Sequence, residues 1–374
     1  MTAKSIWIAL SDDWELRGNG LGDVQNHQYD TALQLMDCYD ALGVSATFNV
    51  EVMQQMAFER FQNRFPEIAK QAGLWRQAVT AMAERGYDVQ LHTHPQWHDA
   101  EYDGRRWRLD RRWDITLYTP AEIDRFIGEG LAFLSEFVPQ TDLIAFRSGS
   151  WGIGPPSRPL MEALIRHGIK LDVSIVAGLV YCGESIALDY RRLECPYDPY
   201  YPDLDDARKV SAEPHGLVEI PTQSVPLEAV LGSPLSPVRV RETVKPLVRG
   251  LRCVKTGLQR MLTGRSRDPF EVPLSPFGVW SRCDFVMDFG VRRPVDHWIR
   301  AVDLVIDRAK TTPGQSFLVF ENHTKDLMAQ SDFDRIGKIV RHIQERYGDM
   351  IRFVHLKDMA NNLDLLTPRL SGVS

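Results

Sequence analysis

Short apolar runs alternate with longer amphipathic stretches along most of the chain. Residues 5–10 (SIWIAL) are apolar after the first position, which is typical of a short buried strand. Residues 29–43 carry apolar side chains at every third or fourth position and end at Gly43, which predicts a helix. A capping pattern from Thr119 to Glu122 begins another helix. The other predicted strands are 44–50, 87–92, 142–146, 169–175, 216–224, 316–323 and 351–356, and the other predicted helices are 66–85, 119–137, 156–167 and 332–347.

Strands that alternate with helices over short connections predict a parallel sheet with helices outside, either open or closed into a barrel. In such folds the carboxyl ends of the strands form the active face. Polar clusters lie at or just after five of the predicted strands, whereas unrelated polar residues would scatter over both ends. We therefore expect these clusters to form one site. They are Asp12–Asp13, His92–His94, Arg147, Asp172 and His323.

One region interrupts the alternation. The chain has 374 residues, and barrels of this kind can exceed about 250 residues as one unit. We expect a single domain over 1–374, with an insertion over 179–296 that includes an acidic, proline-rich loop at 194–206. Residues 237–268 hold nine lysines or arginines against two acidic residues, a local charge of +7. Two interpretations stay open: a solvated face, or a surface that docks on an anionic membrane.

Charge and composition exclude several classes of function. The net charge of −6 and the pI near 6.0 argue against nucleic acid as a partner. No apolar run approaches the ~20 residues that span a bilayer, and the apolar part of residues 1–15 is too short for a secretion signal. The five cysteines form no CxxC pair and their number is odd, which favours reduced thiols and a cytoplasmic protein. Such a protein could still contact the inner membrane face through residues 237–268.

The segment VQLHTHPQWH (89–98) concentrates three of the chain's 10 histidines. On an extended strand end His92 and His94 face the same side, and two imidazoles with one carboxylate are a standard ligand set for zinc with an open water position. His94 and His98 would share a face only in a helix. Spacing alone leaves the choice of pair open.

The adjacent carboxylates Asp12 and Asp13 point in different directions on a strand end. They can therefore do different work: one can bind a metal while the other accepts a proton from water. A turn or a helix cap is the structural alternative for such a pair.

Taken in order, six motifs resemble the polysaccharide deacetylase family with NodB homology, the carbohydrate esterases of family four. They are ALSDDWE, ATFNV, LHTHP, FRSGSWG, LDVS and FENH, and the resemblance covers about residues 5–356. It implies a distorted (β/α) barrel of about seven parallel strands, here with the insertion after the fifth. It also implies a divalent metal, expected to be zinc, and removal of an acetyl group from the nitrogen or oxygen of a sugar or glycan.

The resemblance implies a role for each matching residue. In the family's first motif a base precedes a metal ligand, which correspond to Asp12 and Asp13. The second motif has two metal-binding histidines, usually four apart, and a proline often follows the second. A proline follows His94 here, so the better match is His92 and His94, with His98 as the alternative ligand.

The later motifs supply the remaining catalytic groups. Arg147 corresponds to the arginine that pairs with the base. Asp172 corresponds to the aspartate that orients the catalytic histidine, and His323 to that histidine, the general acid.

The chain departs from the family pattern at three positions. Trp14 replaces a glycine, Gly149 replaces a proline, and Glu321 replaces the leucine that helps to form the acetyl pocket. These changes predict an altered acyl pocket or substrate. The residues expected to contact the substrate are Trp14, Trp97, Trp151, Tyr200, Tyr201 and Glu321.

Two further functions remain as alternatives. The same metal site can hydrolyse another non-peptide C–N bond, such as a cyclic amide, or the chain can be an inactive carbohydrate-binding relative. For a cytoplasmic deacetylase the expected partner is an acetylated sugar or glycan, such as a nucleotide sugar or a lipid-linked intermediate at the inner membrane face.

Overall fold

The computed structural model describes residues 5–182, 187–232, 281–282 and 284–366. Its core is a parallel sheet in the strand order β10-β7-β6-β3-β2-β1-β14, with β15 paired to the start of β1. Seven strands on this path confirm the predicted barrel class. The strands are β1 (Ile6–Trp14), β2 (Thr47–Glu51), β3 (Asp88–Thr93), β6 (Ala145–Ser148), β7 (Leu171–Asp172), β10 (Val218–Glu219), β14 (Ser316–His323) and β15 (Ile351–Phe353).

The sheet curls until its two ends approach each other. Thr222, just past β10, forms a parallel bridge with Val319 of β14, and the backbone N–H of Gln223 donates to the Val319 carbonyl at 3.1 Å. This contact brings the last strand on the path beside the first. All seven carboxyl ends therefore surround one mouth.

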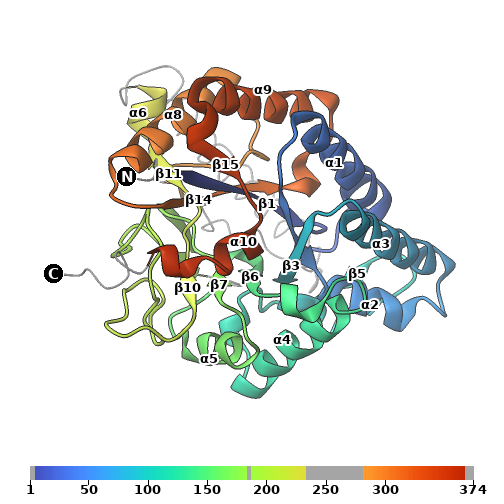
Figure 1. Cartoon of the computed structure of the whole chain (residues 1–374). Coiled ribbons are helices and arrows are strands. Elements are labelled where there is room, and N and C mark those ends of the chain that lie inside the picture. The colour runs from blue at the N-terminus through green and yellow to red at the C-terminus, as the bar shows by residue number, and fades with distance from the viewer. Residues whose placement is uncertain (1–4, 183–186, 233–280, 283, 367–374) are drawn as a thin grey trace, which may run out of the picture.

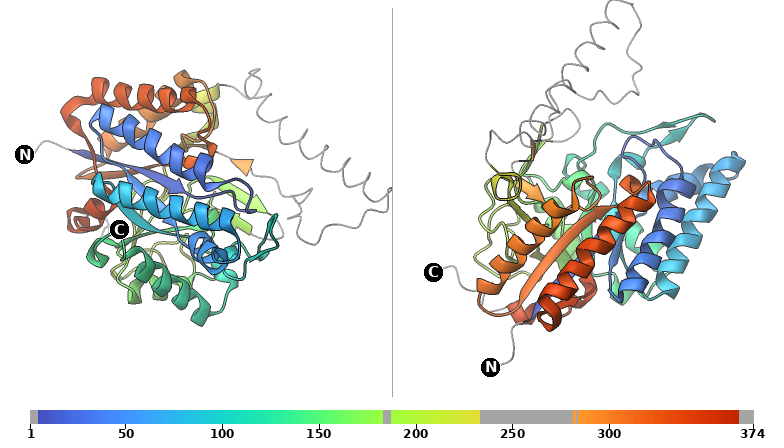
Figure 2. Two further views of the ribbon diagram at one scale, coloured as in Figure 1. Left: turned by 90° about the vertical axis from the view of Figure 1, so that its right-hand side faces the viewer. Right: turned by 90° about the horizontal axis from the view of Figure 1, so that it is seen from above.

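Helices cover the outside of the sheet, and one of them begins at the capping box that the sequence predicts. In Figure 1 they form a ring around the strands, and in the right-hand view of Figure 2 α8, α9, α1 and α3 lie side by side. Thr119 and Glu122 form the expected capping box of α4. The helices are α1 (Asp30–Leu42), α2 (Met53–Phe61), α3 (Pro66–Glu84), α4 (Pro120–Leu134), α5 (Arg158–Arg166), α6 (Leu227–Leu231), α8 (Val295–Thr311), α9 (Gln330–Tyr347) and α10 (Leu356–Ala360).

Short antiparallel strands lie outside the barrel sheet. The β7–β10 connection contains β8 and β9, and the β4–β5 hairpin lies between β3 and α4. The sixth barrel strand, β10, lies inside the region 179–296 that we predicted as an insertion, so that region contributes to the barrel. The minor strands are β4 (Glu101–Tyr102), β5 (Trp107–Arg108), β8 (Leu179–Cys182), β9 (Ala187–Asp189), β11 (Ser224–Pro226), β12 (Ser281–Arg282) and β13 (Asp284–Val286).

The basic stretch 237–268 lies outside the described residues, so its docking on a membrane stays a prediction. Within the described part of the chain, none of the helices combines the length and the apolarity that crossing a bilayer requires.

The amino-terminal end of the barrel is apolar and closed. Interior side chains from five strands pack with Leu356 and Met359 of α10, and this helix binds the starts of β2 and β3: the Leu356 N–H donates to Thr47 Oγ1 at 2.9 Å and the Lys357 N–H to Asp88 Oδ2 at 3.2 Å. The polar interior residues lie at the opposite, carboxyl end of the strands. The packed interior residues are Ala9, Ala145, Leu171, Val173, Val218, Ile220, Phe317 and Val319.

We predict that Leu356→Ala destabilises the fold by about 2–5 kcal/mol, because it removes a fully buried side chain from this closed end. The measurement is urea unfolding, with the same dependence of the free energy of unfolding on urea concentration in both proteins. Leu365→Ala, at a residue 45% exposed, is the matched control and should change the free energy of unfolding by no more than about 0.5 kcal/mol. Equal effects of both substitutions would contradict the packing role of α10.

Candidate active site

The end of β1 sends its polar side chains to two sides of the sheet. Successive residues of a strand face opposite ways, so Asp13 points into the barrel while Asp12 and Trp14 point toward the helices. Asp13 Oδ1 accepts from Asn49 Nδ2 at 2.8 Å and from Arg147 Nε at 3.1 Å. Glu15, the next residue after β1, also faces inward.

Asp12 lies in the outer layer. Its carboxylate accepts from the Tyr39 hydroxyl at 3.0 Å and from Asn322 Nδ2 at 2.8 Å, and burial raises its pKa to about 7, against the lowering effect of these hydrogen bonds. Neither Arg147 nor a described histidine lies within 4 Å of it. The structure therefore does not bring Asp12 to the arginine with which the sequence paired it.

Glu15, His92 and His94 form a group that could hold a metal. One ligand atom from each residue lies within 4.8 Å of the others, and all three are buried. Glu15 Oε2 lies 3.3 Å from His92 Nε2 and also contacts His94 Nε2. The predicted pair of histidines is thus together, but the carboxylate beside it is Glu15 and not Asp13. His98 lies away from this group, where Arg125 Nη2 is 3.0 Å from His98 Nε2.

Both imidazoles point a ring nitrogen at Glu15. His92 Nδ1 lies 2.9 Å from the Arg147 carbonyl, which can only accept, so the ring donates from Nδ1. His92 Nε2 faces Glu15 Oε2 at 3.3 Å and donates to it while it carries a proton. His94 Nε2 is buried and has no aligned hydrogen-bond partner among the described residues, although it touches Glu15. The Nε2 atoms of both rings thus converge on the Glu15 carboxylate, and release of their protons would leave two nitrogen ligands and one oxygen ligand, a set that fits a divalent metal.

Lys325 also contacts Glu15. Its ammonium touches Oε1, opposite the oxygen that faces the histidines, and its side chain is 18% exposed. Burial alone would raise the pKa of Glu15, but the charges of His94 and Lys325 hold it well below its ordinary value. A metal at this group would therefore share Glu15 with a lysine.

Arg147 connects two other acidic side chains. It is fully buried, with Nε on Asp13 and Nη2 at 2.7 Å from Glu321 Oε2, and charges from both carboxylates raise its pKa further despite burial. Asp13, Glu321 and His323 are close enough to form a second candidate metal group. Because the guanidinium of Arg147 already pairs with both carboxylates, this group is the less suitable for a metal.

His323 faces three carboxylates. Its Nε2 lies 3.6 Å from Asp13 Oδ2, and its Nδ1 lies 3.4 Å from Asp288 Oδ1 and 3.3 Å from Glu321 Oε1. Burial alone would lower the pKa of His323, but Asp288 above all, with Glu321, raises it to about 9. The imidazole is therefore protonated at neutral pH.

Asp172 is not one of these carboxylates, which corrects the sequence expectation that it orients His323. Its neighbours Leu171 and Val173 fill the barrel interior, so its own side chain faces the outer layer. There it accepts from the Ser174 N–H at 3.0 Å and lies beside Glu219, and burial raises its pKa to about 6. Four of the five predicted clusters meet at the mouth, and this one does not.

Trp151 is the predicted substrate residue that reaches the mouth together with Glu321. The indole Nε1 donates to Glu321 Oε1 at 3.0 Å, and the ring lies 5.3 Å from the His323 ring. Both Ser150 and Trp151 have φ of 55°, a left-handed conformation that side chains seldom adopt and that often occurs at functional sites. Gly149 allows this loop to approach, since a Cβ there would lie 2.8 Å from the His94 ring.

The other predicted aromatic contacts lie elsewhere. Trp14 and Trp97 are buried in the outer core, against Trp75 and Phe58 respectively, and Tyr200 is buried with its hydroxyl on the Ala207 carbonyl at 2.7 Å. Tyr201 packs on His215. These four residues stabilise the fold and do not line the mouth.

Sequence reasoning missed four residues of the site: Glu15, Asn49, Asp288 and Lys325. Glu15 and Lys325 each lie two positions beyond a predicted site residue, so strand alternation continued past the strand end would have indicated them. Asn49 lies in the motif ATFNV, to which the sequence analysis assigned no function. Asp288 had no local signal, because it reaches His323 only through a bridge between Asp288 and Glu321.

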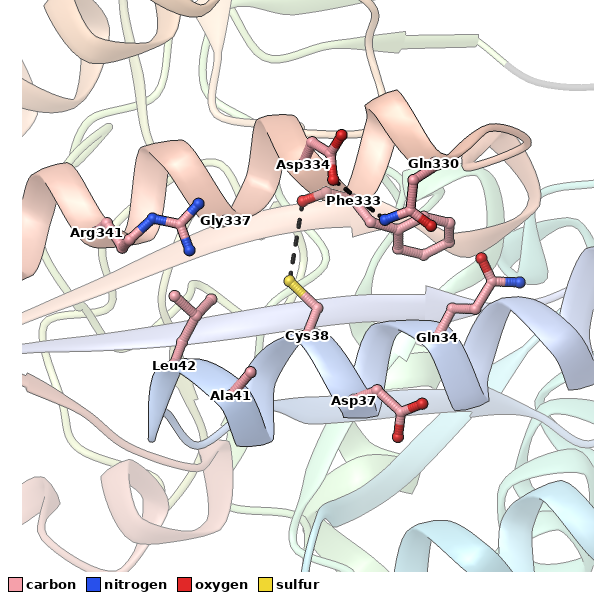
Figure 3. A pocket seen from close by; sticks show the side chains of 10 residues that line it. All are labelled: Gln34, Asp37, Cys38, Ala41, Leu42, Gln330, Phe333, Asp334, Gly337 and Arg341. Carbon is pink, nitrogen blue, oxygen red and sulfur yellow. Dashed lines mark hydrogen bonds between the residues drawn. The ribbon is translucent and has the colours of Figure 1, made fainter.

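One hollow of the described surface lies away from this mouth. Its volume is about 310 Å³. Figure 3 shows its side chains between α1 and α9, where the Cys38 thiol donates to the Phe333 carbonyl. It contains none of the predicted site residues.

Comparisons with known proteins agree on the fold. No protein-family model matches the sequence, and no curated protein matches it significantly. A proposed polysaccharide deacetylase from Mycobacterium smegmatis aligns over 98% of this chain and 92% of its own, with a TM-score of 0.52 and 11% identity. A proposed glycoside hydrolase/deacetylase from Parabacteroides distasonis aligns over 96% of this chain and 70% of its own, with a TM-score of 0.51 and 12% identity. The resemblance to polysaccharide deacetylases is thus confirmed at the level of the fold, of which this chain is a divergent example.

Proposed function

We propose that this protein is a metal-dependent hydrolase that removes an acetyl group from a sugar or glycan. The observation that carries the proposal is the placement of Glu15, His92 and His94 beside two acid–base groups, Asp13 and His323, at the carboxyl end of a deacetylase-type barrel.

Glu15, His92 and His94 would hold the metal. Two nitrogen ligands and one oxygen ligand suit zinc, the metal that the sequence resemblance implies. A bound divalent ion supplies Lewis acidity, which favours the ionisation of water and polarises a carbonyl group.

Asp13 is the proposed general base, in place of Asp12. Burial alone would raise its pKa, but Arg147 above all, with His92 and His323, lowers it below the ordinary value. The carboxylate is therefore ionised at neutral pH and can accept a proton from water. Its partner Arg147 matches the arginine of the family's third motif, which pairs with the base. This match supports Asp13, one residue after Asp12, as the base.

His323 is the proposed general acid. Its protonated imidazole can donate to the leaving nitrogen or oxygen of the substrate, and Asp288 with Glu321 fixes the ring through Nδ1. Groups of this kind contribute about 10²–10⁴-fold in rate. Trp151 covers one side of His323 and limits its access to water.

One observation favours the second candidate, hydrolysis of another non-peptide C–N bond. Glu321 stands where the family has the leucine of its acetyl pocket, and it is bound by Arg147 and Trp151. An acidic residue in place of an apolar one changes the lining beside His323, and this departure favours a substrate other than an acetylated sugar, such as a cyclic amide.

We predict that His92→Ala, His94→Ala and Glu15→Gln each lower the affinity for zinc by more than the 10–100-fold that is typical when only a supporting partner is lost. The measurement is metal content after dialysis, with titration calorimetry. His98→Ala and Asp12→Asn are the controls and should keep the metal. Loss of metal in His98→Ala with retention in His92→Ala would contradict the ligand set.

We predict that Asp13→Asn lowers kcat by at least about 10²-fold, because it removes the general base, whereas its neighbour Asp12→Asn stays within about tenfold. Acetate release from a panel of N- and O-acetylated sugars measures both. A larger loss in Asp12→Asn would restore the role expected from the sequence. Absence of acetate from every substrate, with cleavage of cyclic amides, would favour the second candidate function.

The pH dependence tests Asp288 as the residue that positions His323. An acid with a pKa of about 9 is lost as pH rises through that value, so kcat/KM should fall above about pH 9. Asp288→Asn removes the carboxylate that contributes most to raising this pKa, so the fall should move to lower pH. Asp172→Asn is the control and should leave the alkaline limb in place; a shift in this variant and not in Asp288→Asn would contradict the assignment.

A further inference from the structure

A second hollow of about 340 Å³ adjoins the proposed active site. It is lined by Arg17, Gly290, Arg292, Asp326 and Met328. Arg17 lies two residues beyond Glu15, and Asp326 directly follows Lys325. Gly290 brings the hollow to the general acid, since a Cβ there would lie 3.2 Å from the backbone nitrogen of His323. A ligand in this hollow would therefore extend from the reacting group.

The two arginines of the hollow differ in their surroundings. Arg292 is 60% exposed but fixed, because its Nη2 lies 2.7 Å and its Nε 3.1 Å from the carboxylate of Asp332. Arg17 is exposed, and no carboxylate within the described parts of the chain pairs with it. The rim thus presents one oriented guanidinium and one without a direct ion pair among the described residues, and Asp326 is the acidic group of the same hollow.

These side chains suit an anionic sugar. Guanidinium groups bind phosphate and carboxylate through paired N–H donors, and the carboxylate of Asp326 can accept hydrogen bonds from sugar hydroxyls. We propose that the hollow binds a phosphate or carboxylate group carried by the substrate, so that the preferred substrate is an acetylated sugar with a negative charge. This inference takes the reaction from the proposed function and adds the class of substrate.

Binding tests the subsite without turnover. Titration calorimetry of the full, metal-loaded chain uses N-acetylglucosamine 1-phosphate, N-acetylmuramic acid, which carries a carboxylate, and uncharged N-acetylglucosamine. At least one charged sugar should bind about tenfold or more tightly than the neutral one, and Arg17→Gln should remove most of that preference. The phosphate and carboxylate arms identify which anion is preferred.

A matched variant and a kinetic measurement complete the test. Arg300→Gln, on the exposed face of α8, should leave the preference unchanged, and Arg17→Lys should retain part of it. In acetate release, Arg17→Gln should raise KM for the charged sugar with little change in kcat.

Equal binding of charged and neutral sugars, or a preference that survives Arg17→Gln, would overturn the subsite while leaving the proposed hydrolysis intact. Charge-dependent binding without acetate release would instead support the subsite and contradict the proposed reaction.

Discussion

The buried guanidinium of Arg147 is the interaction on which the rest of the barrel mouth depends. It contacts Asp13 of β1, Glu321 of β14, the Val173 carbonyl after β7 and Thr222 after β10. Its own carbonyl faces the imidazole of His92. A buried charge is tolerated only when it is paired, and the loss of one partner of such a pair typically costs 3–5 kcal/mol.

This single residue therefore couples the shape of the barrel to its chemistry. Thr222 also forms the bridge that brings the segment after β10 to β14. The cation that holds Asp13 ionised therefore also contacts the residue at which the sheet closes. Without the guanidinium, Asp13 and Glu321 would be two buried carboxylates around His323, and their charges could not both persist.

Charge is also balanced in the outer part of the mouth. Glu15 lies between the two histidines on one side and Lys325 on the other. A divalent ion there adds positive charge beside an existing ammonium, which favours an anionic ligand near the metal. If the rim hollow binds the substrate as proposed, the guanidinium of Arg17 acts in the same direction, against the carboxylate of Asp326 in the same hollow.

The sequence by itself determined the class of fold and most of the strands that supply the site. Apolar runs alternating with amphipathic helices predict the parallel barrel, since this periodicity depends on local geometry, and the order of polar clusters located His92, His94, Arg147 and His323. Helices α2, α6, α8 and α10 were missed. Strand β6 begins three residues later than predicted, because residues 140–142 form a helical turn.

Tertiary structure alone decided which neighbouring side chain faces the interior. A shift of one residue along a strand moves a side chain to the other face, so DD in the sequence could not distinguish Asp12, which binds Tyr39 in the outer layer, from Asp13, which binds Arg147. The same alternation turns Asp172 away from His323. Asp288 takes that contact from a segment 35 residues earlier in the chain, and no local pattern carries such information because the proximity arises only when distant strands pair.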